Sequence, residues 1–334
     1  MTKKGKLVAA AALVAVLICT YFGCYLGARV CVKNGYFVAA DRLLFVSPLT
    51  KLHDSKLVTY ANAGNSLQNR HYDEAKEGFA SISGYLEADG YARMADYRHA
   101  LQCADKNEFS KAFDLMSALA KQGYGDSKEK EKEIKYRWAW ALAEEGKYLE
   151  AYDKMDSIRS YPGAKDALSL LSEPLYIEGQ IAYSAGQYYA AKPYFSKIPD
   201  FEDAQVYLTL IKVHSSSSYF STTEAKKIVD QLEDYFYFED TAELLVSHHS
   251  LAKIFLLGTW KGDGYYFTMK DTGGTTYNLP WLSGADYYRI ENGIYYVHSD
   301  SSPEKPQFRF TLLTPDSMNV YDYKNSKTYT LYRK

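Results

Sequence analysis

The chain has 334 residues, of which 47% are hydrophobic and 24% are charged, and this length and composition exclude a wholly disordered chain while leaving room for two or three domains. The formal net charge is −2 at pH 7, but residues 33–250 alone carry 25 basic and 33 acidic residues. Nucleic-acid-binding proteins gain most of their affinity by neutralising phosphates, so this acidic middle excludes nucleic acid as a partner.

The N-terminal segment has the composition of a membrane-spanning helix. Three lysines in residues 1–6 precede an uncharged run over residues 7–28. A spanning helix needs about 20 apolar residues, whereas the apolar part of a cleaved signal peptide has about 7–15. We predict a cytoplasmic N-terminus over 1–6 and a single-pass membrane anchor over 7–28, with a cleaved signal or a lipid anchor at Cys24 as alternatives. The lysines favour an extracytoplasmic location for the bulk of the chain, although Arg29 and Lys33 partly balance them.

Residues 33–250 contain a repeated pattern, Y-x2-[AG]-x8-[YF]-x2-A-x3-[FM]-x2-[IL]. Apolar residues at helical spacing predict two helices in each copy. The alanine or glycine at the [AG] position is small enough for the two helices to approach closely. A weaker fifth copy surrounds Ala225, and Phe37, Ala40 and Leu44 indicate a lone second helix directly after the anchor. The four full copies are Tyr60, Ala63, Tyr72, Ala75, Phe79, Ile82; Tyr97, Ala100, Phe109, Ala112, Met116, Leu119; Tyr136, Ala139, Tyr148, Ala151, Met155, Ile158; and Tyr176, Gly179, Tyr188, Ala191, Phe195, Ile198.

This spacing resembles that of the tetratricopeptide repeat family. The family implies an all-α solenoid of stacked helical hairpins, with a concave surface that binds protein segments. The chain departs from the family in its longer repeats, in the Ile or Leu late in each second helix, and in the absence of a regular closing proline. The resemblance places four tyrosines on the concave side, and three further residues extend this possible binding surface; the full set is Tyr60, Tyr97, Leu101, Tyr136, Trp140, Tyr176 and Tyr183. The alternative is that the tyrosines pack between neighbouring repeats.

Residues 251–334 are predicted to form a small antiparallel β-domain. Strand-forming residues occur in about seven short runs, joined by turn signals such as Asn292-Gly293 and Pro315-Asp316. The opening segment Leu257-Gly258-Thr259-Trp260 resembles the first strand of lipocalin-like and fatty-acid-binding barrels, in which the tryptophan plugs the base of the barrel. We therefore expect a meander or small barrel, with a solid core favoured over a ligand cavity.

Motifs for catalysis or metal binding are missing from the sequence. Ser250 and Lys253 match S-x-x-K, but the partner motifs of that chemistry do not occur. His248 and His249 are adjacent, and adjacent helical residues point in different directions. Cys103 is the only cysteine after residue 31, so no intramolecular disulfide is expected in the rest of the chain. We predict no enzyme activity, no cofactor and no catalytic or metal-binding residue.

The sequence thus predicts a non-enzymatic, membrane-anchored interaction scaffold of the bacterial cell envelope. The membrane contact is assigned to residues 7–28, and protein partners are assigned to the helical repeats over 33–250. The alternative is a ligand-binding or sensing protein, in which the C-terminal β-domain holds a small apolar or glycan ligand.

Overall fold

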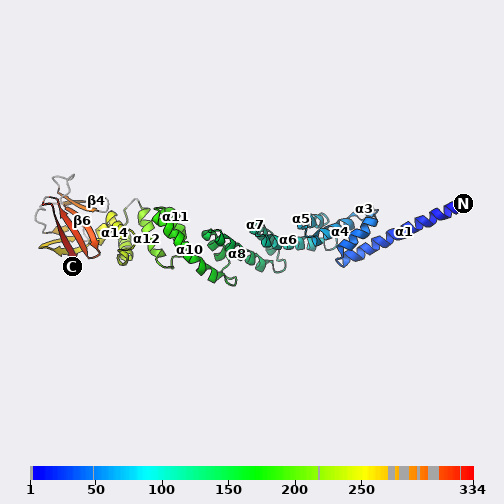
Figure 1. Ribbon diagram of the computed structural model, residues 1–334, viewed down its shortest axis with the longest axis horizontal. Coiled ribbons are helices and arrows are strands. Elements are labelled where there is room, and N and C mark those ends of the chain that lie inside the picture. Colours follow the sequence, from blue (N-terminus) through cyan, green and yellow to red (C-terminus); the bar gives the residue numbers. More distant parts are fainter. Residues whose placement is uncertain are drawn as a thin grey trace. The chain divides into compact units, whose positions relative to one another are not determined.

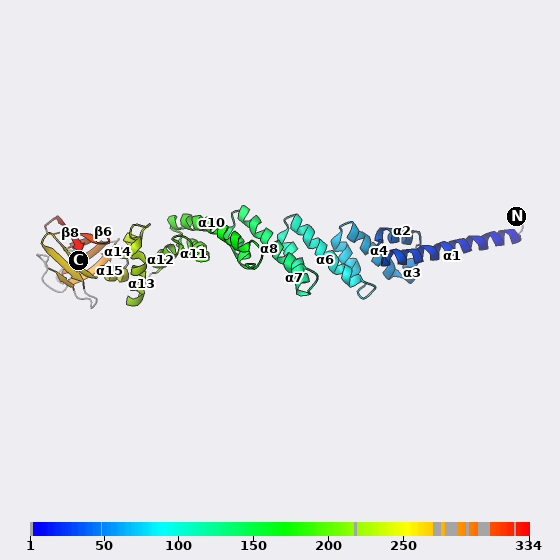
Figure 2. The same ribbon diagram turned by 90° about the horizontal axis from the view of Figure 1, so that it is seen from below.

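The computed structural model describes residues 3–47, 49–216, 219–269, 275–277, 286–291, 294–299, 308–323 and 325–334. Over these residues the chain is mostly helical, with fifteen α-helices followed by a small antiparallel sheet (Figure 1, Figure 2). The chain divides into two compact units, residues 1–168 and residues 169–334. The change from helix to strand lies in the second unit, between Phe255 and Gly258.

Unit 1 is built from helices, each of which packs mainly against its neighbours in the chain. Contacts join α1 to α2 and α2 to α4, and then each helix to the next from α4 as far as the pair α8 and α9. The helices of unit 1 are α1 (Lys3–Lys33), α2 (Phe37–Val46), α3 (Thr50–His53), α4 (Ser55–Gln68), α5 (Tyr72–Ala80), α6 (Ala88–Asp105), α7 (Phe109–Lys121), α8 (Ser127–Glu144) and α9 (Tyr148–Asp156); α10 (Ala164–Ser184) begins in this unit.

The repeat pattern marks the packed faces of these helices. In unit 1, the central alanines Ala75, Ala112 and Ala151 are fully buried. So are the large residues one turn later, Phe79, Met116 and Met155. Residues four apart on a helix share a face, so each second helix presents one apolar stripe to its neighbours.

The turn between the two helices of each pair also recurs. In the first helix pair and in the four full copies, the second residue before the second helix has a positive φ, and the residue after it donates its N–H to the carbonyl of the residue five positions earlier. Examples are His71 to Ser66 (2.9 Å) and Glu108 to Cys103 (2.8 Å). This hydrogen bond satisfies a carbonyl that the helix end leaves without a partner. Glycine and asparagine adopt the required positive φ readily. The residues with positive φ are Gly35, Arg70, Asn107 and Gly146 in unit 1 and Gly186 in unit 2.

The turn at Gly35 shows that α1 and α2 form such a pair. Tyr25 and Ala28, near the end of α1, stand at the same distances before Ala40 as Tyr60 and Ala63 stand before Ala75. Ala28 is fully buried. The expected lone second helix therefore has a partner, which is the C-terminal part of α1. The same helix is long and apolar enough to cross a membrane over Ala9–Lys33, so one helix carries both features.

The helices of unit 2 continue the pattern. Ala191 and Phe195 are fully buried, and a Cβ on Gly179 would lie 2.8 Å from Cζ of Phe195, so only glycine fits there. Ala225, at the weaker fifth copy, is also buried. After α10, the helices are α11 (Tyr188–Lys197), α12 (Ala204–His214), α13 (Thr222–Leu232), the short 3-10 helix η1 (Glu233–Tyr235), α14 (Thr241–Ser247) and α15 (His249–Phe255).

The sheet is antiparallel throughout, with the strand order β3-β2-β1-β8-β7-β6-β5-β4. The turn at Pro315-Asp316 joins β6 to β7 as expected, whereas Asn292-Gly293 lies outside the described residues. The strands are β1 (Gly258–Gly262), β2 (Tyr265–Met269), β3 (Thr275–Tyr277), β4 (Asp286–Glu291), β5 (Ile294–Ser299), β6 (Phe308–Thr314), β7 (Ser317–Asp322) and β8 (Lys327–Arg333).

The sheet is open, which corrects the expectation of a barrel. Among the described strands, β3 and β4 form the two edges and are not paired with each other. Closure requires a hydrogen-bonded ladder between the two edge strands, and the barrel resemblance rested on one motif in the first strand. The short strand β3 also brings the described strands to eight, one more than the sequence indicated.

Trp260 sits where the sheet meets the helices of unit 2. Its ring is fully buried, and its Nε1 donates a hydrogen bond to the carbonyl of Leu256 (3.1 Å). The Arg333 guanidinium lies 4.7 Å from the Trp260 ring centroid and 4.9 Å from that of Phe255. The first and last strands are thereby tied to the end of α15.

Candidate functional site

The residues of the predicted binding surface fall in both units. Tyr60 on α4, Tyr97 and Leu101 on α6, and Tyr136 and Trp140 on α8 belong to unit 1. Tyr60 is only 3% exposed and belongs to the core of that unit, whereas the other four are half-buried. In unit 2, α10 carries Tyr176, which is half-buried, and Tyr183, which is buried.

The four tyrosines at the first position of the pattern share one kind of contact. Each ring touches an aromatic ring in the segment after the second helix of its own copy. Because that segment leads into the next helix pair, the contact links successive pairs, as the packing alternative requires. The centroid distances are 6.1 Å for Tyr60–Tyr85, 5.9 Å for Tyr97–Tyr124, 5.3 Å for Tyr136–Tyr161 and, in unit 2, 5.6 Å for Tyr176–Phe201.

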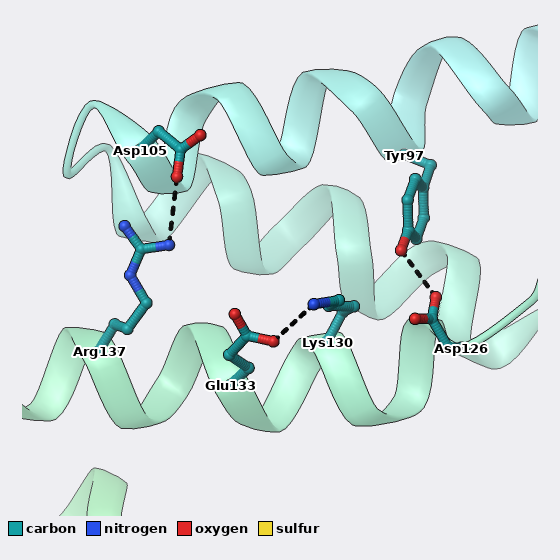
Figure 3. Close-up of polar contacts among 6 residues, drawn as sticks. All are labelled: Tyr97, Asp105, Asp126, Lys130, Glu133 and Arg137. Atoms are coloured by element: carbon teal, nitrogen blue, oxygen red, sulfur yellow. Dashed lines mark hydrogen bonds and ion pairs between the residues drawn. The ribbon is translucent and has the colours of Figure 1, made fainter.

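Tyr97, and Tyr25 at the equivalent place in the first pair, also bind the residue that precedes the next first helix. The Tyr97 hydroxyl donates to Oδ1 of Asp126, the residue before α8, at 2.7 Å (Figure 3). At the equivalent place in the first pair, the Tyr25 hydroxyl donates to Oδ2 of Asp54 at 3.1 Å. Asp54 caps α4 by accepting from the backbone N–H of Leu57. The acidic residues that precede the first helices therefore connect neighbouring helix pairs.

A second contact fastens α6 to α8 further along the two helices. Arg137 on α8 donates to Oδ1 of Asp105 at 3.3 Å and to the carbonyl of Ala104 at 2.9 Å. Figure 3 shows this contact and the Tyr97–Asp126 bond at opposite ends of the stretch along which α6 and α8 lie side by side. The ion pair of Lys130 with Glu133 (2.8 Å) lies between them on α8. The two helices are thus parallel and held at both ends.

Burial changes the acidity of the tyrosines that make these contacts. It raises the pKa of Tyr60 to about 12. Burial, together with the hydrogen bond to Asp126, raises the pKa of Tyr97 to about 12 as well. Both hydroxyls therefore stay protonated at neutral pH and remain hydrogen-bond donors.

We expect the free energy of unfolding to fall as the pH rises from about 10 to about 12. The raised pKa values mean that the folded chain holds the tyrosine protons that the unfolded chain releases above pH 10.0. This contribution to stability is complete below pH 10 and is lost as the pH passes through about 12. Urea unfolding across this range measures it, and a Tyr60→Phe, Tyr97→Phe double variant should show a shallower decline. Tyr36→Phe, at an exposed ring, is the control; an equal change in its slope would contradict the assignment.

The two tryptophans of α8 lie in different surroundings. Trp138 contacts Phe113, with ring centroids 6.3 Å apart, and the Lys154 ammonium lies 3.3 Å above its ring. Trp140 is half-buried, and its ring centroid lies 6.3 Å from that of Tyr136. Leu101, on the neighbouring α6, is half-buried too. These two side chains leave part of their apolar surface open to solvent.

A cavity of about 460 Å³ lies near the end of α1 and includes Tyr60 in its wall. Its size is within the usual range of ligand pockets. The sequence did not indicate it, because Leu26 lies inside the uncharged run and Val30 just beyond it, so neither was assigned to a site. Its other wall residues come from α1, α4, the segment 85–87 before α6, and the start of α6, and include Arg29, Lys33, Leu57 and Tyr91.

A polar cluster occupies unit 2 around Tyr183. Its hydroxyl donates to Oδ1 of Asp240, and Nε2 of His214 lies 2.5 Å from the other carboxylate oxygen. Tyr188 stacks on the His214 ring, with centroids 3.9 Å apart. Burial would raise the pKa of Asp240, but the hydrogen bonds from His214 and Tyr183 outweigh it and lower the pKa below its usual value. The cluster connects α10, α11 and α12 to the residue before α14, so Tyr183 has a structural role.

Comparison with known proteins gives no relative: no family model, no curated protein and no solved structure matches this chain. Within the described part of the chain, no group of three or more His, Cys, Asp or Glu residues is placed to hold a metal ion.

Proposed function

We propose that the protein is a single-pass membrane scaffold that binds a protein partner through its helical array. The observation that carries this proposal is the half-buried apolar pair Leu101 and Trp140, on first helices that are held parallel by Tyr97 and Arg137. Tryptophan is enriched among the residues that dominate binding energy at protein interfaces. A rigid frame lowers the entropy cost of presenting such residues to a partner.

The array is proposed to be a tetratricopeptide-like solenoid. The recurring positive-φ turn, the buried alanines of each copy and the repeated tyrosine contacts support one structural unit used several times. In such a solenoid each unit contacts only its neighbours, so the array offers an extended surface to a peptide or a helix. The alternative of a ligand inside the β-domain lacks comparable support, because Trp260, Met318, Val320 and Leu331 fill the described interior beside the sheet.

We expect Trp140→Ala to weaken partner binding by at least about tenfold, as is typical of a tryptophan that anchors an interface. The measurement is retention of the partner captured by the full chain from native membranes, together with the melting temperature of the variant. Trp138→Ala is the matched control, on the same helix but packed against Phe113 and Lys154. Equal loss of the partner from both variants, or unchanged binding by Trp140→Ala, would contradict the proposed surface.

We expect protease added outside intact cells to digest the bulk of the chain and to leave a short N-terminal fragment. The basis is the three lysines before the uncharged run, which favour a cytoplasmic N-terminus. Antibodies against each terminus, used before and after lysis, follow the fragments. Protection of the C-terminal domain until the cells are lysed would reverse the proposed orientation.

A further inference from the structure

Large apolar side chains are exposed at the end of α2 and around α3. Phe45 is 88% exposed and Leu52 is 84% exposed, and Val46 and Leu49 are exposed as well. We call these four residues the apolar tip. Soluble surfaces seldom gather so many large apolar side chains, and such a patch usually marks a contact with a partner or a membrane.

The apolar tip lies beside the uncharged part of α1. From the turn at Gly35, α2 folds back along α1, and Leu43 comes within 3.3 Å of the position that a Cβ on Gly27 would take. Further along, the His53 ring at the end of α3 lies 4.9 Å from the Tyr25 ring and 5.7 Å from the Tyr21 ring. In Figure 2, α2 and α3 flank α1, which continues alone towards its N-terminus.

Because the apolar tip and α3 lie beside α1, a bilayer cannot surround the whole uncharged run of α1 without also contacting them. At 1.5 Å per residue, the stretch from Tyr21 to Ala28 is about 10 Å long. A bilayer that covered the whole uncharged run would therefore immerse α3 and the apolar tip. A bilayer that ended before Tyr21 would leave residues 7–20, about 21 Å of helix, to cross a hydrocarbon layer about 30 Å thick.

We propose that the apolar tip is inserted into the bilayer interface beside α1, on the side from which α1 continues into unit 1. The inference rests on the proposed role of α1 as a membrane anchor. Insertion adds the apolar side chains of the tip to the apolar surface of residues 7–20 of α1, which alone are too short to span the bilayer. It also removes Phe45 and Leu52 from water. Tyr21 and Tyr25 then lie at the depth where tyrosines gather in membrane proteins. Lys51 and Arg42, near the apolar tip in the chain, can extend to the headgroups.

This insertion would give unit 1 two attachments to the same membrane. A single flexible anchor leaves a domain free to tilt, but α1 runs without a break into the first helix pair. With α1 and the apolar tip both in lipid, the orientation of the first helix pair relative to the bilayer surface is fixed.

The test uses the full chain in phosphatidylcholine–phosphatidylglycerol vesicles, with its four cysteines replaced by alanine and one new cysteine carrying an environment-sensitive dye. Phe45→Cys and Leu52→Cys report on the apolar tip. Leu17→Cys, at an exposed position of α1, reports on the anchor, and Lys121→Cys, at an exposed position at the end of α7, reports on solvent. Nitroxide lipids labelled high or deep in the acyl chain quench the dye according to its depth.

We expect the dye at Phe45 and Leu52 to shift to the blue and to lose more emission to the shallow nitroxide than to the deep one. The dye at Leu17 should be quenched most by the deep nitroxide, and that at Lys121 by neither. Quenching at Leu17 with solvent-like emission at Phe45 and Leu52 would overturn the inference while leaving the anchor in place, and would make the apolar tip a surface for a protein or for a second copy. Unquenched emission at Leu17 would refute the anchor, and the inference with it.

Discussion

Truncating Tyr60 to alanine is expected to lower the free energy of unfolding of unit 1 by about 3–5 kcal/mol, the usual cost of removing a buried aromatic side chain. The ring packs among Phe37, Phe79 and Tyr91, with centroids at 6.0, 5.2 and 5.9 Å. These partners come from α2, α5 and α6, so the cavity would lie where these three helices meet α4. Urea unfolding of the full chain in detergent, followed by far-ultraviolet circular dichroism, measures the loss.

Two further variants distinguish the contribution of the Tyr60 ring to stability from that of its hydroxyl and from that of the pattern position as such. Tyr60→Phe keeps the ring and should cost no more than about 1 kcal/mol, the net value of one hydrogen bond. Tyr136→Ala truncates the same pattern position where the ring is half-buried, and it should cost clearly less than Tyr60→Ala. Equal losses for Tyr60→Ala and Tyr136→Ala would show that the burial of Tyr60 does not govern its contribution.

The periodicity of the sequence was enough to find the packed faces of the helices. Ala75, Ala112, Ala151 and Ala191 are all fully buried, as their helical spacing indicated. The pattern could not tell the buried Tyr60 from the half-buried tyrosines at the same position, because it contains only residues within one copy. Whether a tyrosine is buried depends on rings from neighbouring segments, such as Tyr91 beside Tyr60, and that position varies between copies: Tyr91 lies six residues before Tyr97, and Lys130 lies six residues before Tyr136.

The first helix pair could not be seen from composition, for a similar reason. Tyr25 and Ala28 satisfy the repeat spacing, yet they lie in an uncharged run whose length also fits a membrane span. Hydropathy counts residues along the chain and does not report which of them pack against α2. The open sheet is a comparable case: whether the edge strands β3 and β4 pair with each other depends on contacts between strands, which period-two patterns do not specify.

The residues of the predicted binding surface differ in how far the structure buries them. Leu101 and Trp140 are half-buried on neighbouring first helices, so they remain available to a partner. Tyr183, a possible member of the predicted binding surface, is buried and hydrogen-bonds Asp240 in unit 2. That bond joins residues 57 positions apart, and no local signal connects them. The cavity beside α1 was not predicted: of its wall residues, only Leu26 lies in the predicted anchor and only Tyr60 belongs to the predicted binding surface.

Truncating Trp260 to alanine is expected to destabilise the β-domain by about 3–5 kcal/mol, because the side chain is the largest one fully buried in the described chain. The loss should extend beyond the sheet. The Leu256 carbonyl would lose the indole donor, and the Arg333 guanidinium would lose one of its two rings. Tyr332→Ala, on the exposed side of β8, is the control and should cost much less.

Hydrogen–deuterium exchange of the Trp260→Ala variant shows how far this coupling extends. Arg333 reaches from β8 to the carbonyl of Phe255 and to Glu233 of η1. These contacts hold the last strand, the end of α15 and η1 together, so disturbing Arg333 should loosen all three. We therefore expect β8, α15 and η1 to lose amide protection together, along with β1, which carries the substitution and pairs with β8. Loss of protection in the strands with α15 unchanged would show that the sheet unfolds independently of the helices on which it rests.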